Sequence, residues 1–378
     1  MGPLSGIRVI ELAGMGPAPF CGMMLADMGA EVICINRARS GRPDEQIMFE
    51  RGKKSLVVNL KRPEGVQLVL KFCKKADALI EGFRPGVMER LGLGPEVCLA
   101  VNPKLVYGRI TGWGQGGPLN QKAGHDINYI SVAGVLQAIG RKAQPPMPPL
   151  NLIADFGGGG MLLAFGIACA LLEVQKSGKG QVVDAAMIDG SALLMAMFLS
   201  RYSDPRFSGE RGTNIFDTGA HFYNVYETKD GKYISVGAIE PQFYKALIDK
   251  LGLDPVEFGN YMDRNAWPEC KEKFASLFKL KTRDEWCNLM GDADACFTPV
   301  LSIPEAYEHP QNRERSTYIK LDGIIQAAPA PRYSRTEAVI SHGMHSPGQD
   351  TDDVLTDYGF TKDEIKAFLE AGILSVDK

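Results

Sequence analysis

The sequence is poor in histidine and tryptophan and has no paired-cysteine motif. Its 378 residues include five histidines and three tryptophans, and none of its eight cysteines forms a C-x-x-C pair. No cysteine or histidine cluster has the ligand spacing of a structural zinc site. We therefore expect reduced thiols, mostly buried, and no metal centre.

An excess of charge of either sign is also missing. The chain carries 42 lysines and arginines against 45 aspartates and glutamates, a formal net charge of −3. Without a general basic excess, nucleic acid is not expected as a partner, although a local basic pocket stays open. Hydrophobic residues make up 45% and charged residues 23% of the chain, which is ordinary for a globular protein.

Signals for export or membrane insertion are weak. The N-terminal residues MGPLSGIRVIEL contain no basic segment followed by an apolar core, so we expect no secretory signal. The final Ser-Val-Asp-Lys differs from a peroxisomal S-K-L address. The uncharged run from Phe156 to Leu172 is barely long enough to span a bilayer and has four glycines near its start. We expect it to form a buried helix of an α/β domain, and we expect no membrane partner.

The N-terminal half alternates between strand and helix patterns. Pro17 and Pro19 suit the first turn of a helix through Phe20–Met28. Strands are predicted at Ile7–Leu12, Glu31–Asn36, Ser55–Leu60, Ala76–Phe83, Leu105–Thr111 and Val182–Ala185, and further helices at Glu64–Lys75 and near Asp189–Leu199. This alternation predicts a mostly parallel sheet with helices on both faces, in a large domain over residues 1–200.

The character changes after residue 200. A loop-like stretch over 203–219 leads to a hairpin with an Asp-Gly turn, between strands Tyr223–Thr228 and Lys232–Ala238. Helices are predicted at Pro241–Lys250, Trp267–Phe278 and Arg283–Met290. We expect a smaller α+β domain over residues 220–320. A proline-rich linker over 327–334 then returns the chain, as residues 330–378, to the large domain. A capping box at Thr361–Glu364 opens a final helix, Lys362–Leu369.

The turn after the first strand, Gly14-Met15-Gly16, resembles a dinucleotide fingerprint only in part. Pro19 stands where the third glycine would be, and the second strand ends in Arg37 rather than in an acidic residue. Both features disfavour a nicotinamide cofactor. An arginine at this strand end fits a ribose phosphate better, and coenzyme A carries a 3′-phosphate on its ribose.

Three polar residues stand at candidate catalytic positions, and residue type leaves each of them open. His125 lies in a glycine-led turn, and Asp126 beside it could simply cap a helix. Asp155 precedes four glycines, so it is either a helix cap or part of an anion site built on accessible backbone N–H groups. Glu240, between a strand and a helix, is either a helix-start carboxylate or a partner for a histidine.

An ordered set of motifs favours the catalytic readings. They are LADMGAEV, FRPGVMERLGLGP, GHDINY, PPLNLIADFGGGG, SGKGQVVDAAM, VGAIEPQFY and DACFTPV. These motifs resemble the α-methylacyl-CoA racemases of the CoA-transferase family III superfamily, and the resemblance extends from residue 5 to about 360. The resemblance implies a Rossmann-like α/β large domain, a smaller α+β domain and an interlocked homodimer. The active site would then lie between the large and small domains of different subunits.

The resemblance also assigns residues. His125 and Asp155 match the two catalytic bases, Glu240 the carboxylate that orients the histidine, and Asp126 an acidic neighbour. The resemblance also implies that ten residues bind the acyl-CoA substrate: Arg37, Val58, Asn59, Leu60, Lys61, Arg84, Gly124, Ile127, Asn128 and Tyr129. No cofactor is implied beyond the coenzyme A of the substrate. Thr218 and His221 depart from the pattern, where glycine and proline are expected.

The implied reaction interconverts (R)- and (S)-2-methylacyl-CoA thioesters by a 1,1-proton transfer through an enolate, in branched-chain fatty acid and bile acid intermediate metabolism. His125 would remove the proton from the S face, and protonated Asp155 would supply one to the R face. The implied compartment is mitochondrial or peroxisomal in an animal and cytoplasmic otherwise. The alternative is a family III CoA-transferase in which Asp155 is the nucleophile.

Overall fold

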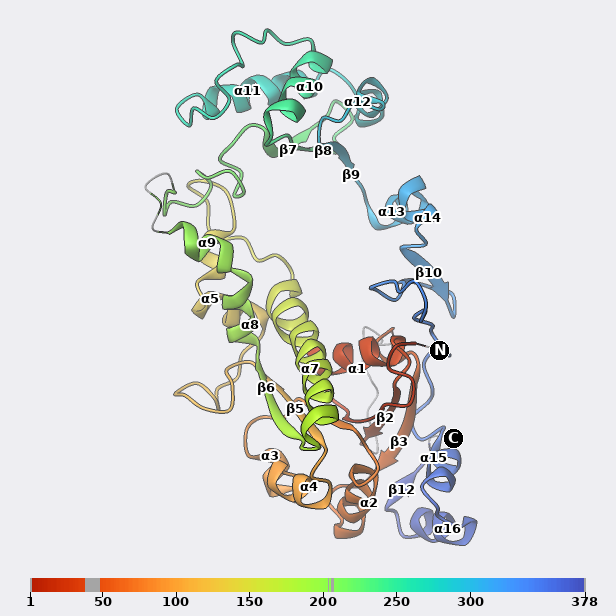
Figure 1. Cartoon of the computed structure of the whole chain (residues 1–378). Helices are drawn as coiled ribbons and strands as arrows, with labels where there is room; N and C mark the ends of the chain where they lie inside the picture. The colour runs from red at the N-terminus through yellow and green to blue at the C-terminus, as the bar shows by residue number, and fades with distance from the viewer. Residues whose placement is uncertain (1, 38–47, 203, 205–206, 377–378) are drawn as a thin grey trace. The chain divides into compact units, whose positions relative to one another are not determined.

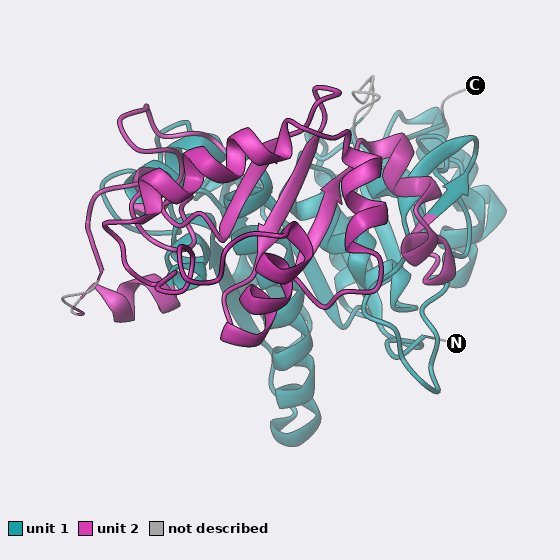
Figure 2. Cartoon of the chain, turned by 90° about the horizontal axis from the view of Figure 1, so that it is seen from above, with its two compact units in different colours: residues 1–133, 149–195, 319–378 teal, residues 134–148, 196–318 magenta. Residues whose placement is uncertain are grey.

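The computed structural model describes residues 2–37, 48–202, 204 and 207–376 and divides into two units (Figure 2). The first unit comprises Met1–Ala133, Pro149–Met195 and Ile319–Lys378. The second comprises Gly134–Pro148 and Ala196–Tyr318. The chain therefore leaves the first unit twice, and the short excursion at 134–148 comes directly before the segment that carries Asp155.

A seven-stranded sheet forms the centre of the first unit, in the order β12-β3-β2-β1-β4-β5-β6 (Figure 1). All neighbouring pairs are parallel except β12 with β3. The strands are β1 (Arg8–Leu12), β2 (Glu31–Asn36), β3 (Lys53–Val58), β4 (Ala78–Glu81), β5 (Val106–Thr111), β6 (Gln181–Ala186) and β12 (Leu374–Ser375). The prediction of a mostly parallel α/β sheet is confirmed.

Helices surround this sheet and account for its buried, β-branched strands. They are α1 (Pro17–Asp27), α2 (Pro63–Cys73), α3 (Val87–Arg90), α4 (Pro95–Val101), α5 (Asp126–Val132), the π-helical segment η2 (Leu152–Met161), α7 (Leu162–Ser177), α8 (Met187–Leu194), α15 (Thr351–Asp357) and α16 (Lys362–Glu370). Thr361 caps α16 through Glu364, as predicted. Side chains such as Ile10, Ile33 and Leu56 are fully buried, and each contributes about 1.5–3 kcal/mol.

Two of the differences from the predicted boundaries in this unit have identifiable reasons. Strand β3 begins at Lys53, two residues before the predicted start; Lys53 pairs with Val32 of β2, and its ammonium is buried beside the Glu11 carboxylate at 2.7 Å. Because lysine is usually exposed, the hydrophobic pattern did not indicate a buried strand position at Lys53. The helix predicted near Asp189–Leu199 is two helices, α8 and α9 (Ala196–Arg201), which meet at Met195.

The uncharged segment, predicted to be a buried helix, is buried on one side only. Leu152–Ser177 forms one continuous helical stretch whose length and composition would suffice to cross a membrane, a test that core helices of soluble proteins also pass. Leu163 and Ile167 are fully buried, whereas Phe165 is 67% and Leu172 is 59% exposed. One side of the helix is therefore part of the core, and the other is an apolar surface of this chain.

The second unit contains a three-stranded antiparallel sheet, β7-β8-β9, formed by Tyr223–Glu227, Tyr233–Gly237 and Phe297–Val300. Its helices are α6 (Val135–Ala138), α9, α10 (Pro241–Leu251), α11 (Trp267–Phe278), α12 (Arg283–Met290), α13 (Ile303–Glu308) and α14 (Pro310–Glu314). The predicted hairpin and the three predicted helices are confirmed. Aromatic side chains, among them Phe222, Phe274 and Trp286, fill its core.

The two departures noted in the sequence have structural consequences here. Thr218, where glycine is expected, has φ 74°, a left-handed conformation that a β-branched residue adopts only under strain. His221, where proline is expected, is fully buried, and its Nε2 lies 2.8 Å from the hydroxyl of Tyr244. A proline could not make that contact, so His221 is a polar member of an aromatic core.

Acid is expected to destabilise the second unit through His221. Burial, with a smaller effect of Lys271, lowers the imidazole pKa from 6.5 to about 4. Because the folded pKa lies below the unfolded one, this contribution to stability is complete above about pH 6.5 and is lost as pH falls through 4. In His221→Gln, the unfolding free energy should fall less steeply over that range. Urea titrations followed by tryptophan fluorescence measure this, and equal slopes in variant and wild type would refute the assignment.

Candidate active site

Asp155 lies in the first turn of η2, half-buried and held by its neighbours. The side-chain amide of Asn151, four residues earlier, donates to Asp155 Oδ2 at 3.0 Å. The pKa of the Asp155 carboxyl is raised, chiefly by burial and also by the nearby Asp126 charge, while Asn151 and His125 act in the opposite direction. Burial therefore makes the Asp155 carboxyl easier to protonate than an exposed aspartate.

Asp126 connects the chain segments that carry the two candidate bases, because it follows His125 and bonds to the backbone of Asp155. It is the first residue of α5 and is buried, and its Oδ2 accepts hydrogen bonds from the backbone N–H groups of Ala154 at 2.7 Å and Asp155 at 2.9 Å. One carboxylate thus satisfies two donors at the start of η2. Asp126 does not cap its own helix, because His125 occupies that position. It supports the neighbouring helix, which carries Asp155.

His125 stands at the N-cap of α5, with extended backbone (φ −131°, ψ 176°), and it is exposed. Its backbone N–H donates to Oδ1 of Asn128 at 3.0 Å, which fixes the turn. The next residue, Asp126, accepts hydrogen bonds from the backbone of Ala154 and Asp155, so the start of α5 lies against the segment that carries Asp155. The placement of His125 matches the simple reading of an exposed helix-start residue, and its role as a base stays a prediction.

The predicted role of the four glycines is wrong. We expected accessible N–H groups at a helix start, but the helix begins at Leu152, and Gly158, Gly159 and Gly160 are buried inside it. A Cβ on Gly158 would lie 2.7 Å from the backbone nitrogen of Ser191, and one on Gly160 would lie 2.8 Å from the carbonyl oxygen of Pro17. Gly158 and Gly160 allow η2 to pack directly on the backbones of α8 and α1, and the glycine run lies inside the helix instead of forming its accessible start.

Gly16 is a second residue near Asp155, which sequence reasoning did not select. It precedes α1, has φ 67°, and a Cβ built on it would lie 3.9 Å from Asp155 Oδ2. The Gly14-Met15-Gly16 turn, considered above as a nucleotide fingerprint, therefore lies beside the candidate acid. Asn151 was missed as well, although its position four residues before Asp155 was the available signal.

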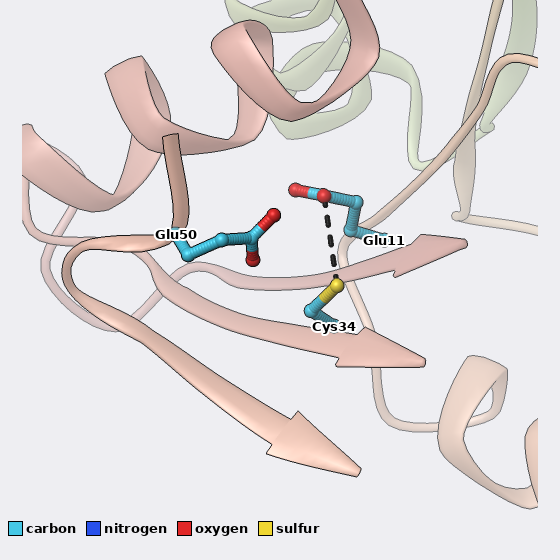
Figure 3. Close-up of side chains that lie close together, drawn as sticks. All are labelled: Glu11, Cys34 and Glu50. Atoms are coloured by element: carbon cyan, nitrogen blue, oxygen red, sulfur yellow. Dashed lines mark hydrogen bonds between the residues drawn. The ribbon is translucent and has the colours of Figure 1, made fainter. Parts of the chain in front are cut away.

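One buried cluster in the described part of the chain has the composition of a metal site: Glu11, Cys34 and Glu50 (Figure 3). The Cys34 thiol donates to Glu11 Oε1 at 3.6 Å. The Lys53 ammonium lies 2.7 Å from Glu11 Oε2 and donates to the carbonyl of Pro19 at 2.9 Å. Because the Lys53 ammonium already pairs with the Glu11 carboxylate, we interpret the cluster as an ion-paired part of the core.

Candidate binding residues follow the carboxyl ends of parallel strands. Arg37 comes directly after β2, the turn containing Gly16 follows β1, and Phe83 and Arg84 follow β4. The Arg37 guanidinium lies over the Phe83 ring at 5.4 Å, and Arg84 is exposed beside it. Ligands of open α/β sheets bind at this edge. Contact of the two arginines with the phosphates of coenzyme A stays a prediction.

A family model for CoA-transferase family III matches residues 4–351. The chain belongs to CoA-transferase family III. An α-methylacyl-CoA racemase of Mus musculus is 48% identical over 378 residues, covering 99% of this chain and 98% of the mouse protein. The α-methylacyl-CoA racemase of Homo sapiens is 45% identical over 365 residues, covering 96% and 95%. A CAIB/BAIF family protein from Brucella suis has the same fold, with a TM-score of 0.82, 23% identity and coverage of 94% and 99%.

In this family III chain, the segment Gly124–Tyr129 forms a firm turn beside Asp155. The Tyr129 hydroxyl donates to the carbonyl of Gly124, and its ring contacts Trp113 edge-on at 4.9 Å. Burial and the nearby Asp155 raise the pKa of Tyr129 to about 12. Ile127 and Asn128 are exposed.

At the end of β3, Val58 is buried, Asn59 and Leu60 are half-buried and Lys61 is exposed. Contact of these residues with coenzyme A stays a prediction.

Glu240 belongs to the second unit. It is the exposed N-cap of α10, three residues after the end of β8. The Tyr261 hydroxyl donates to the carbonyl of Ile239 at 3.0 Å and supports this turn. The structure thus matches the reading of Glu240 as a helix-start carboxylate. Its role as the partner of His125 stays a prediction.

Proposed function

We propose that this chain racemises 2-methylacyl-CoA thioesters by moving the α-proton between His125 and Asp155. The observation that carries the proposal is the Asp126 carboxylate, which ties the backbone of Asp155 to the residue next to His125. Two groups that can exchange protons are thereby held in one rigid unit. The chain's similarity to racemases over nearly its whole length supports the same activity.

The reaction needs a base on one face of the α-carbon and an acid on the other, because a thioester α-proton is only weakly acidic. Neutral His125 removes the proton from the S face, and the electron pair of the broken C–H bond passes into the enolate. Protonated Asp155 then delivers its proton to the R face. The raised pKa of Asp155 suits this role. On the return path the two residues exchange roles, and Glu240 orients the imidazole.

The alternative within the family is a CoA-transferase with Asp155 as nucleophile, which would pass through a mixed anhydride and an aspartyl-CoA thioester. The racemase is favoured because a transferase would have no use for a base at His125. The similarity of the chain to racemases over nearly its whole length supports the same choice.

The decisive experiment uses each pure enantiomer of a 2-methylacyl-CoA in deuterated water. We expect inversion of both enantiomers together with uptake of deuterium at the α-carbon. Inversion without deuterium uptake would exclude the two-base scheme. Trapping of an acyl-enzyme with hydroxylamine, together with transfer to a free acid, would instead establish the transferase.

We also propose that the protein acts as a homodimer whose subunits interlock. The exposed apolar face of η2, α7 and α8 supports this, because Met161, Phe165, Leu172, Leu193 and Leu194 are each at least half exposed in the single chain. A second copy of the chain is the occupant we propose. Sedimentation velocity should give a dimer for the wild type, and Phe165→Glu should weaken it. A monomeric, active wild type would refute the proposal.

A further inference from the structure

We infer that Asn151 is a positioning residue that binds one oxygen of Asp155 and thereby makes the other, Oδ1, the atom that carries the transferred proton. The inference rests on the proposed racemase function and adds an atom-level role to it. Its starting observation is the hydrogen bond from Asn151 Nδ2 to Asp155 Oδ2 at 3.0 Å.

Asn151 does not serve the helix in the ordinary way. It occupies the N-cap of η2, yet its side chain makes no capping hydrogen bond to the helix backbone. Asparagine at this position normally accepts from a first-turn N–H group. Here the Asp126 carboxylate accepts from Ala154 and Asp155 instead. The Asn151 side chain is therefore available for the Asp155 carboxyl.

The two oxygens of Asp155 have different surroundings. Oδ2 accepts the Asn151 amide on one side and faces Gly16 on another, at 3.9 Å from the position of a Cβ on that glycine. Oδ1 has no hydrogen-bond partner among the residues that the structure describes. An oxygen that already accepts from an N–H donor is the carbonyl-like one in a protonated carboxyl group. The proton therefore resides on Oδ1, the oxygen left for the substrate.

The backbone before Asn151 is strained in a way that fits this role. Leu150 has φ 59° and is 75% exposed. A bulky residue in the left-handed region is unfavourable, and no burial of its side chain compensates for that cost. This left-handed conformation of Leu150 lies in the turn that places Asn151 within hydrogen-bond distance of Asp155.

The test compares Asn151→Ala and the nearly isosteric Asn151→Asp with the control Asn288→Ala, an exposed asparagine of α12 in the second unit. Loss of the hydrogen bond leaves the carboxyl free to rotate, so kcat of Asn151→Ala should fall about 10-fold to 100-fold with KM little changed. Asn288→Ala should behave as the wild type. Circular dichroism melts establish that each variant is folded.

The pH profile separates positioning from a merely structural role. The groups near Asp155 are Asp126, His125, Tyr129 and Asn151. Removing the amide removes a hydrogen bond that stabilises the carboxylate, so the limb of the kcat profile that reports Asp155 should move to higher pH. Asn151→Asp adds a second carboxylate and should move that limb further. An unchanged limb in a folded Asn151→Ala or Asn151→Asp, or an unchanged kcat, would overturn the inference.

The outcome also separates the inference from the proposed function. If wild type fails to incorporate deuterium, the racemase itself is wrong. If wild type exchanges the α-proton and either folded Asn151 variant keeps the wild-type kcat or the wild-type pH profile, the racemase stands and the role of Asn151 is wrong.

Discussion

Asp155→Asn is expected to abolish racemisation while leaving proton exchange with one enantiomer. His125 can still remove and return the proton on its own face, so the (S)-thioester should take up deuterium without inverting. The (R)-thioester should be inert. General acid–base groups contribute about 10²-fold to 10⁴-fold, and racemisation should fall by at least that range. Chiral analysis of recovered substrate with mass spectrometry measures both quantities.

The mirror-image result is expected for His125→Ala, which should exchange only the (R)-thioester. Asp353→Asn, an exposed aspartate of α15, is the matched control and should racemise normally. Together the two variants assign each base to its face. The reversed pattern would keep the two-base mechanism but exchange the faces. A fully active His125→Ala variant would rule out the mechanism.

Gly190→Ala is expected to unfold the first unit or to weaken it severely. A Cβ on Gly190 would lie 1.8 Å from the carbonyl oxygen of Gly158, and backbone atoms cannot move aside as the tip of a flexible side chain can. The helices η2 and α8 therefore cross at direct backbone contact. Forcing them apart should cost about 3 kcal/mol or more. It should also lower activity, because η2 carries Asp155.

The measurement is the urea midpoint of Gly190→Ala and of Gly158→Ala, where the added Cβ would lie 2.7 Å from the Ser191 nitrogen. Gly116→Ala is the matched control, since nothing lies within 4 Å of its added Cβ. The control should change stability by less than 1 kcal/mol, at about the level of an ordinary surface substitution. A wild-type midpoint for Gly190→Ala would contradict the close crossing.

Local signals in the sequence were sufficient for most elements. Pro17 at the first turn of α1 and the Thr361–Glu364 capping box predict helix starts because they satisfy or remove N–H groups within a few residues. The predicted helices α11 and α12 match the structure residue for residue. The same reasoning starts strand β3 two residues too late, because the charge of Lys53 is buried in an ion pair with Glu11 that the local sequence does not indicate.

The sequence by itself determined the α/β class, the order of the elements and the family, since hydrophobic periodicity, capping and an ordered set of motifs are all readable along the chain. It also selected His125, Asp155 and Asp126. Only the tertiary structure decided how Asp126 works and what the four glycines do. The Asp126 carboxylate accepts hydrogen bonds from another helix, and the glycines let neighbouring backbones approach closely. Both depend on contacts between segments that are far apart in the chain. Side-chain identity alone carries no record of such contacts.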